Sequence, residues 1–142
     1  MEIKTGYFAK VKTYIDNGYL PISISRYSPK WFEGACITEL APSSDLLMRY
    51  KNGKTGISEY KTEYLDYLSR SGINLEELLK PYISDDYKGI VLCCYEKPSD
   101  FCHRHLLADF YNRHYNMNIQ EYSAKCADLS FYIEDEDIII AL

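Results

Sequence analysis

The sequence predicts a single-domain α/β protein, a three-layer Rossmann-like sandwich in which helices flank a small, mostly parallel sheet. Three observations support this class. Residues 89–95 (GIVLCCY) are almost continuously apolar, which is typical of a strand buried on both faces. Segments with helical periodicity lie before and after that strand. The chain has 142 residues, 46% hydrophobic and 26% charged, which suits one folded domain spanning residues 1–142.

The N-terminal part predicts a helix, a strand and a long loop. Residues 5–17 place apolar side chains on one side of a helix, and Gly18 follows as its C-terminal cap. Residues 19–25 (YLPISIS) alternate with the period of a strand, and Pro21 favours the strand's start or a sheet edge. Residues 26–42 predict an ordered loop that leaves the C-terminal end of this strand.

Helical periodicity dominates the middle of the chain. Ser43 or Ser44 caps a helix that runs to about Lys51, and residues 58–70 form the next helix. Residues 74–77 resemble a capping box that opens a short third helix, LEELLKPYI. These helices are expected to cover one or both faces of the sheet.

A further helix and strand are expected after the apolar strand. Ser99 is the expected N-cap of a helix from about residue 100 to 115. Residues 119–123 (IQEYS) predict a short strand, which completes a strand–helix–strand crossover. Residues 131–142 place two apolar runs around an acidic turn and predict a terminal hairpin or edge strand.

Composition limits the function classes. The formal net charge of −5 argues against a broadly basic surface that grips nucleic acid along its length, although a small basic pocket remains compatible with it. The fifteen tyrosines are expected mostly in the core, but such rings also line surfaces that stack on bases. The N-terminus has no apolar run of a secretory signal, and no stretch approaches the ~20 residues of a membrane span. A cytoplasmic protein whose five cysteines are free thiols is expected, rather than a disulfide framework.

Residues 93–105 gather more chemically competent side chains than any other window of the sequence. A strand that ends in a loop and opens a helix points free backbone N–H groups above the sheet edge, where the helix dipole favours anions by about 0.3–1 kcal/mol. Arg104 in the first turn adds a bidentate donor for phosphate or carboxylate. The alternative is a surface arginine that pairs with Asp100 or Asp109.

His103 and Glu96 are the acid–base candidates. His103 precedes Leu106 and Leu107 by one turn, so it should face the sheet, where a general base or a ligand contact would suit. The alternative is a histidine whose ring is satisfied by a backbone carbonyl at the margin of the core. Glu96 is either an acid–base group or a solvated loop carboxylate.

The cysteines of this window divide between the two faces of the strand. Cys94 and Cys102 are expected to meet, because the strand end and the helix start are adjacent, and a thiol at a helix N-terminus suits nucleophilic or redox chemistry. The alternative is that both are small buried hydrophobic side chains. Cys93 should point to the opposite face. The window lacks paired C-x-x-C spacing, so no metal or cofactor is predicted and structural zinc is disfavoured.

The segment LCCYEKPSDFCHRHLLADFYN resembles the signature of the domain-of-unknown-function 488 family, in which a strand ends in Cys-x-Glu and Cys-His-Arg opens a helix. The resemblance extends over TGYFAKVKTYIDNGYLPISISRYSPKWFEG and ELAPSSDLLMRYKNGKTGISEYKTEYL, to about residue 123. Residues that match the motif position by position are Cys94, Glu96, Cys102, His103 and Arg104.

The chain departs from the family pattern after its predicted first strand. Many members resemble Asp-Val-Arg there, whereas this sequence has Ser23-Ile24-Ser25-Arg26. If the family aspartate does chemistry, its role is either missing in this chain or reassigned to Arg26 or Ser25. The resemblance implies a compact α/β fold in which residues 23–31 and 94–104 share a pocket at the C-terminal edge of the sheet. Ser23, Ser25, Arg26 and Trp31 thereby join Arg104 as ligand-binding candidates.

Three functions are compatible with these observations. The first is a small cytoplasmic enzyme or nucleotide-responsive protein whose pocket binds a phosphate-bearing small molecule, a nucleotide or a nucleic-acid end. The second is an interaction module without catalysis that docks a protein partner on a tyrosine-rich surface containing Trp31. The third is a redox sensor that uses Cys94 with Cys102. The oligomeric state is not predicted.

Overall fold

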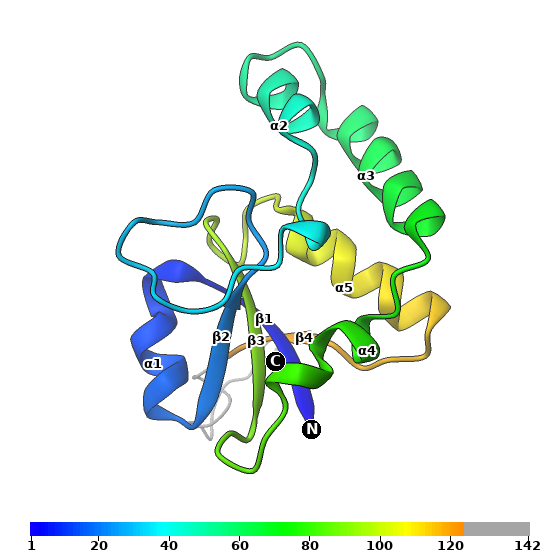
Figure 1. Ribbon diagram of the computed structural model, residues 1–142. Coiled ribbons are helices and arrows are strands. Elements are labelled where there is room, and N and C mark those ends of the chain that lie inside the picture. The colour runs from blue at the N-terminus through cyan, green and yellow to red at the C-terminus, as the bar shows by residue number, and fades with distance from the viewer. Residues whose placement is uncertain (124–142) are drawn as a thin grey trace.

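The computed structural model describes residues 1–123 as a four-stranded parallel sheet with helices on both faces (Figure 1). The strand order is β2-β3-β1-β4, so the apolar strand β3 is internal and β2 lies at an edge, as Pro21 predicted. The predicted α/β class and the parallel sheet are confirmed. The strands are β1 (Glu2–Tyr7), β2 (Tyr19–Ser23), β3 (Gly89–Cys94) and β4 (Gln120–Glu121).

Within residues 1–123, five α-helices accompany the sheet. Short 3-10 turns precede α1, α2 and β3, at residues 8–10, 38–40 and 80–82. No helix within residues 1–123 is long and apolar enough to cross a membrane. The helices are α1 (Val11–Asp16), α2 (Ser44–Lys51), α3 (Ile57–Ser71), α4 (Leu75–Leu79) and α5 (His103–His114).

The alternation of side chains along β3 builds the three layers. Val91 and Cys93 pack on the α1 side of the sheet, whereas Ile90 and Leu92 belong to the larger core beneath α3, α4 and α5. Figure 1 shows α1 on one side of the strands and α4 with α5 on the other. All six residues of β3 are buried, which explains its continuous apolar sequence.

The main correction concerns the N-terminus, where the helix predicted over residues 5–17 is present but begins too early in the prediction. Residues 2–7 form β1, which pairs with β3 at six successive positions, and the helix begins only at Val11. The Tyr14 ring lies over Gly6, where a Cβ would come within 2.5 Å of the Tyr14 hydroxyl oxygen. That hydroxyl accepts a 3.0 Å hydrogen bond from the Tyr7 backbone N–H, which fixes α1 against β1.

The local signals of the middle helices are confirmed. The Ser43 hydroxyl caps α2 by accepting a 3.0 Å bond from the Leu46 backbone N–H. Gly72 follows α3 in the left-handed conformation, with φ of +67°. Of the capping box expected at residues 74–77, one half is found: the Asn74 side chain accepts a 3.1 Å bond from the Glu77 backbone N–H, whereas the Glu77 carboxylate accepts from Lys80.

The C-terminal elements are confirmed with shifted boundaries. Helix α5 starts at His103, with Cys102 rather than Ser99 at its N-cap. The strand expected at residues 119–123 is the two-residue β4, which pairs in parallel with β1. The hairpin or edge strand expected at residues 131–142 lies outside the described residues.

Candidate functional site

A pocket of about 380 Å³ lies where β2 and β3 end and α5 begins. The loop after β2 contributes one wall, and the segment from the end of β3 to the start of α5 contributes another. Helices α2 and α3 complete it. We call it the strand-end pocket. Its lining includes Ser25, Arg26, Tyr27, Tyr50, Lys51, Tyr60, Tyr95, Glu96, Phe101, Cys102 and His103.

Aromatic rings dominate the lining. Tyr50, Tyr60 and Phe101 form a mutually packed trio with ring centroids 5.1–5.7 Å apart. Burial, followed by the charge of Glu96, raises the pKa of Tyr60 far above its usual value, so its hydroxyl stays protonated. Tyr95 stands at the exposed rim and donates a 2.7 Å hydrogen bond to a backbone oxygen of the loop after β2. The pocket therefore has an aromatic wall of rings packed edge to face or tilted, with polar groups at its edges.

Two cations and one carboxylate complete the lining. The Arg26 guanidinium donates from Nε to the Pro42 carbonyl at 3.1 Å and from Nη2 to the Thr38 carbonyl at 3.4 Å. These bonds orient the guanidinium at the wall. Lys51 ends α2, and Glu96 follows β3 in an exposed loop. The site thus joins positive charge with aromatic surface in a protein whose net charge is −5.

His103 is buried, and a backbone carbonyl fixes its ring. Nε2 lies 2.8 Å from the Ile24 carbonyl oxygen. A carbonyl only accepts hydrogen bonds, so Nε2 carries the ring proton. Desolvation by burial lowers the pKa of His103 to about 4, with smaller contributions from the charges of Arg104 and His105. The ring is therefore neutral near pH 7, and its Nδ1 carries a lone pair.

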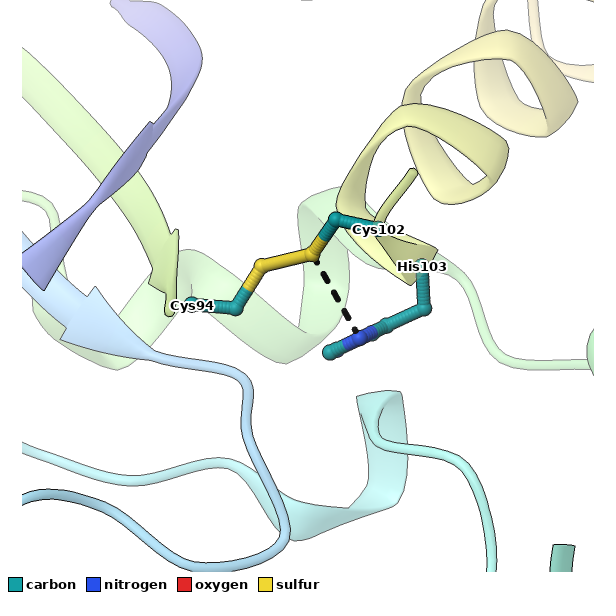
Figure 2. A group of neighbouring side chains, drawn as sticks. All are labelled: Cys94, Cys102 and His103. Atoms are coloured by element: carbon teal, nitrogen blue, oxygen red, sulfur yellow. Dashed lines mark hydrogen bonds between the residues drawn. A yellow bond between two sulfur atoms is a disulfide. The ribbon is translucent and has the colours of Figure 1, made fainter. Parts of the chain in front are cut away.

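The thiols of Cys94 and Cys102 meet, as the sequence predicted, and they are joined in a disulfide (Figure 2). The expectation that every cysteine is a free thiol is corrected for this pair, because the loop brings the end of β3 against the start of α5. The Nδ1 atom of His103 lies 3.8 Å from Cys102 Sγ. We call Cys94, Cys102 and His103 the sulfur–histidine cluster; all three residues are buried.

Cys93 and Cys36 are the free cysteines among the described residues. Cys93 packs in the α1-side core, on the face opposite Cys94, as predicted. Burial raises the pKa of its thiol to about 12, so Cys93 is an unreactive core side chain. Cys36 is exposed in the loop after β2.

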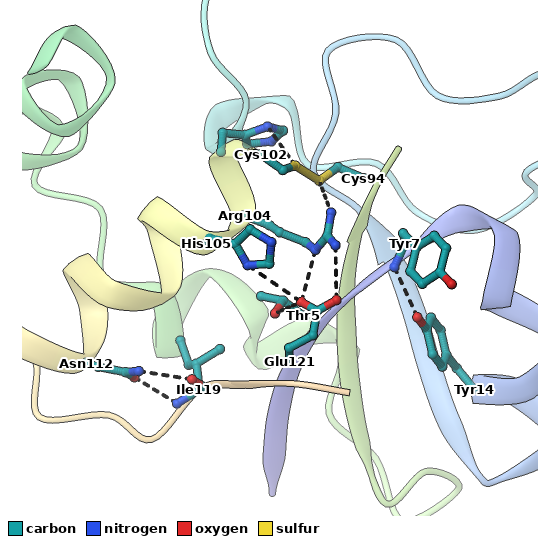
Figure 3. Close-up of polar contacts among 11 residues, drawn as sticks. Thr5, Tyr7, Tyr14, Cys94, Cys102, Arg104, His105, Asn112, Ile119 and Glu121 are labelled. Atoms are coloured by element: carbon teal, nitrogen blue, oxygen red, sulfur yellow. Dashed lines mark hydrogen bonds and ion pairs between the residues drawn. A yellow bond between two sulfur atoms is a disulfide. The ribbon is translucent and has the colours of Figure 1, made fainter. Parts of the chain in front are cut away.

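Arg104 is fully buried rather than presented to solvent. Its Nε and Nη2 donate to the two carboxylate oxygens of Glu121 at 3.1 and 3.0 Å, and Nη1 donates to Cys94 Sγ at 3.1 Å (Figure 3). The Tyr7 ring centre lies 5.9 Å from Cζ. These contacts link α5, β4, β3 and β1, and we call Arg104 with Glu121 the buried ion pair.

The alternative of a surface arginine paired with Asp100 or Asp109 is wrong, because Arg104 is buried and pairs with Glu121. Asp109 pairs instead with Arg113. Arg104 does not belong to the lining of the strand-end pocket, and its direct contact with an anion stays a prediction.

Glu121 is the main polar residue that sequence reasoning missed. Besides Arg104 it binds Thr5, whose hydroxyl donates to Oε1 at 2.7 Å, and His105 Nδ1 lies 3.8 Å from the same oxygen. The one signal for Glu121 in the sequence was that it is an acidic residue within a predicted strand. Its role depends on the placement of β4 beside β1, which no local pattern shows.

The strand-end pocket unites five of the predicted site residues, namely Ser25, Arg26, Glu96, Cys102 and His103. Ser23 is buried behind the wall, where its Oγ accepts a 2.7 Å bond from Ser28. Trp31 is 60% exposed and packs against Phe8 beside a different hollow, near α1. The ligand-binding roles assigned to all these residues stay predictions.

A family model described as DUF488-N3a, active DUF488-N3 subclade, matches residues 10–115. The chain belongs to the DUF488 family. The match spans β2, β3 and α5, which carry the residues of the motif. The description calls the DUF488-N3 subclade active and names no substrate. No curated protein and no solved structure matches the chain.

Proposed function

We propose that the strand-end pocket of this DUF488 protein binds a nucleotide or the phosphate-bearing end of a nucleic acid. One observation carries the proposal, which is the meeting of an aromatic wall with Arg26 and Lys51 at the C-terminal ends of parallel strands. Ligands of open parallel sheets bind outside these strand ends. The volume of about 380 Å³ lies within the usual range for small-molecule pockets, roughly 300–1,000 Å³.

The two parts of a nucleotide suit the two parts of the lining. A base gains about 1–3 kcal/mol from stacking on an aromatic side chain, and Tyr50 and Phe101 are the partly exposed rings of the trio that can supply one, whereas Tyr60 is buried behind them. Phosphate oxygens suit the guanidinium of Arg26 and the ammonium of Lys51. The N-terminal end of α5 adds favourable backbone dipoles.

Within this proposal, Glu96 is the acid–base group. Its carboxylate lies at the pocket wall close enough to Tyr60 to raise that residue's pKa. His103 is a poor base near pH 7, because burial lowers its pKa to about 4 and its Nε2 proton is committed to the Ile24 carbonyl. Proton transfer at the pocket therefore depends mainly on Glu96.

A thermal-shift screen of mono-, di- and triphosphate nucleotides and short oligonucleotides tests the proposal. A binding nucleotide is expected to stabilise the protein by about 2.7 kcal/mol at a concentration 100-fold above Kd. Lys51→Ala should weaken the binding of that nucleotide roughly 10- to 100-fold, because a charged contact with a phosphate is lost. The matched control is Lys54→Ala, an exposed lysine outside the pocket lining. The proposal fails if no nucleotide or oligonucleotide shifts the melting temperature.

The bond between Cys94 and Cys102 favours a second function, thiol-based redox sensing. In the reduced protein, one thiolate attacks hydrogen peroxide to give a sulfenic acid and hydroxide. The second thiol then displaces the sulfenic oxygen as water and closes the disulfide.

Mass spectrometry of reduced protein treated with limiting peroxide measures this reaction. The Cys94–Cys102 disulfide is expected before oxidation of exposed Cys36, while buried Cys93 stays a thiol. Oxidation of Cys36 first would contradict the redox function.

A further inference from the structure

We propose that the reduced protein binds one zinc-type divalent metal ion within the sulfur–histidine cluster. The Sγ atoms of Cys94 and Cys102 and a ring nitrogen of His103 all lie within 4.8 Å of one another (Figure 2). Two thiolates and one imidazole form a known zinc ligand set that leaves a fourth position open for water or substrate. Cys102 and His103 both line the strand-end pocket, so the open position would face its interior.

The His103 ring is already oriented as a metal ligand. Histidines that bind metals usually donate their second ring N–H to a carbonyl or carboxylate, and Nε2 makes this bond to Ile24. The lone pair is left on Nδ1, 3.8 Å from Cys102 Sγ. Sulfur and nitrogen ligands of a tetrahedral zinc ion lie about 3.6 Å apart, given the usual Zn–S and Zn–N distances. The imidazole therefore needs little movement.

The backbone spacing also suits a shared ion. The Cα atoms of Cys94 and Cys102 are 7.6 Å apart, beyond the roughly 4.4–6.8 Å of most disulfides. Two thiolates on one zinc ion lie about 3.8 Å apart, which a wider backbone separation accommodates. Arg104 donates to Cys94 Sγ at 3.1 Å and so compensates part of the negative charge of a coordinated thiolate.

The disulfide and the metal are alternative states of one site. A dithiol reductant gives two electrons and two protons to the Cys94–Cys102 bond and itself becomes a disulfide. Metal binding then releases the two thiol protons to solvent. The oxidised protein offers no thiolate here and should not bind the ion. This inference goes beyond the proposed nucleotide binding, because it concerns a reactive group at the pocket wall.

Titration of reduced, metal-free protein with Co²⁺ tests the site, since thiolate-bound Co²⁺ gives an ultraviolet charge-transfer band and visible bands of a tetrahedral ion. The other thiols are removed by Cys36→Ser, Cys93→Ala and Cys126→Ser, the last outside the described residues. One equivalent of Co²⁺ per chain, displaced by Zn²⁺, is expected. The same protein oxidised at Cys94 and Cys102 should bind none, a comparison that requires no further substitution.

Substitution of each ligand then assigns the site. We expect a loss of Co²⁺ affinity of more than about 100-fold in each of Cys94→Ser, Cys102→Ser and His103→Gln. That loss is larger than the one caused by removing a residue that only hydrogen-bonds a metal ligand. His114→Gln, an exposed histidine at the end of α5, is the matched control and should not change it. Circular dichroism melts verify that each variant folds.

Two results would overturn the metal site: no spectral change in the reduced protein, or equal Co²⁺ binding by the oxidised one. Because no nucleotide is present, neither result bears on the proposed nucleotide binding.

Discussion

Replacing Arg104 with alanine is expected to lower the free energy of unfolding by about 3–5 kcal/mol, as when one partner of a buried ion pair is removed. Arg104 has no exposed surface, whereas the Glu121 side chain is 23% exposed. Because water partly solvates Glu121, we expect a loss near the lower end of that range. The variant leaves the Glu121 carboxylate without its bidentate partner and Cys94 without a donor. Urea denaturation followed by circular dichroism measures the loss, together with a melting temperature lower by roughly 10–20 °C.

Arg113→Ala is the matched control on the same helix. Arg113 pairs with Asp109 at 2.9 Å, but both side chains are largely exposed, and such pairs contribute about 0–1 kcal/mol. Arg104→Lys keeps the charge but loses the bidentate geometry, so an intermediate loss is expected. Equal effects of Arg104→Ala and Arg113→Ala would show that the buried ion pair contributes no more than a surface pair.

The buried ion pair also explains how a two-residue strand keeps its place. β4 contributes only Gln120 and Glu121 to the sheet, too few backbone bonds to hold an edge by themselves. Glu121 fastens it to Arg104 on α5 and to Thr5 on β1. The same guanidinium reaches Cys94, so the edge of the sheet and the sulfur–histidine cluster depend on one side chain. Arg104 therefore connects β4 to the end of β3.

Local chemistry explains which elements the sequence predicted well. Helices α2 and α3 begin and end near their expected residues because Ser43 and Gly72 act through neighbouring backbone groups. Strand β3 was evident because burial on both faces demands a continuous apolar run. Such signals lie within a few residues of the structure that they specify.

Strand β1 escaped prediction because its stability comes from distant partners. Residues 2–7 pair with β3, more than eighty positions away in the sequence, and with β4 beyond it. The helical spacing around Tyr14 is real, but it continues only back to Val11. Gly6 is the residue that distinguishes the strand from the helix that follows, since its missing side chain makes room for the Tyr14 ring.

The candidate site was predictable where parallel strands determine it. The family resemblance implied a pocket shared by residues 23–31 and 94–104, and the parallel pairing of β2 with β3 explains why residues 25–26 and 96–103 lie together at one edge. No sequence pattern placed Tyr50, Lys51 and Tyr60 in this pocket. They come from α2 and α3, whose position above that edge depends on tertiary packing.

Acidification should destabilise the metal-free, disulfide-bonded protein through His103. Burial lowers the pKa of His103 to about 4, against 6.5 in the unfolded chain. Between these values the unfolded chain binds a proton that the folded protein excludes, so the contribution is full above pH 6.5 and lost as pH falls to 4. At 1.36 kcal/mol per pKa unit, the loss totals about 3 kcal/mol, of which about 2 kcal/mol falls between pH 6.5 and 5. Burial also lowers the pKa of His105, which acts in the same direction.

Denaturant midpoints measured from pH 7 to pH 5 in the presence of a chelator isolate this effect, because most carboxylates remain ionised in that range. His103→Gln should flatten the dependence, although Gln loses stability at neutral pH if its amide does not replace the bond to the Ile24 carbonyl. His114→Gln, an exposed histidine on the same helix, should keep the slope of the parent. If His103→Gln and the parent lose stability equally between pH 6.5 and 5, the folded protein protonates His103 in that range. Burial would then not hold the ring neutral, and below neutral pH Nδ1 would carry a proton in place of the lone pair that metal binding requires.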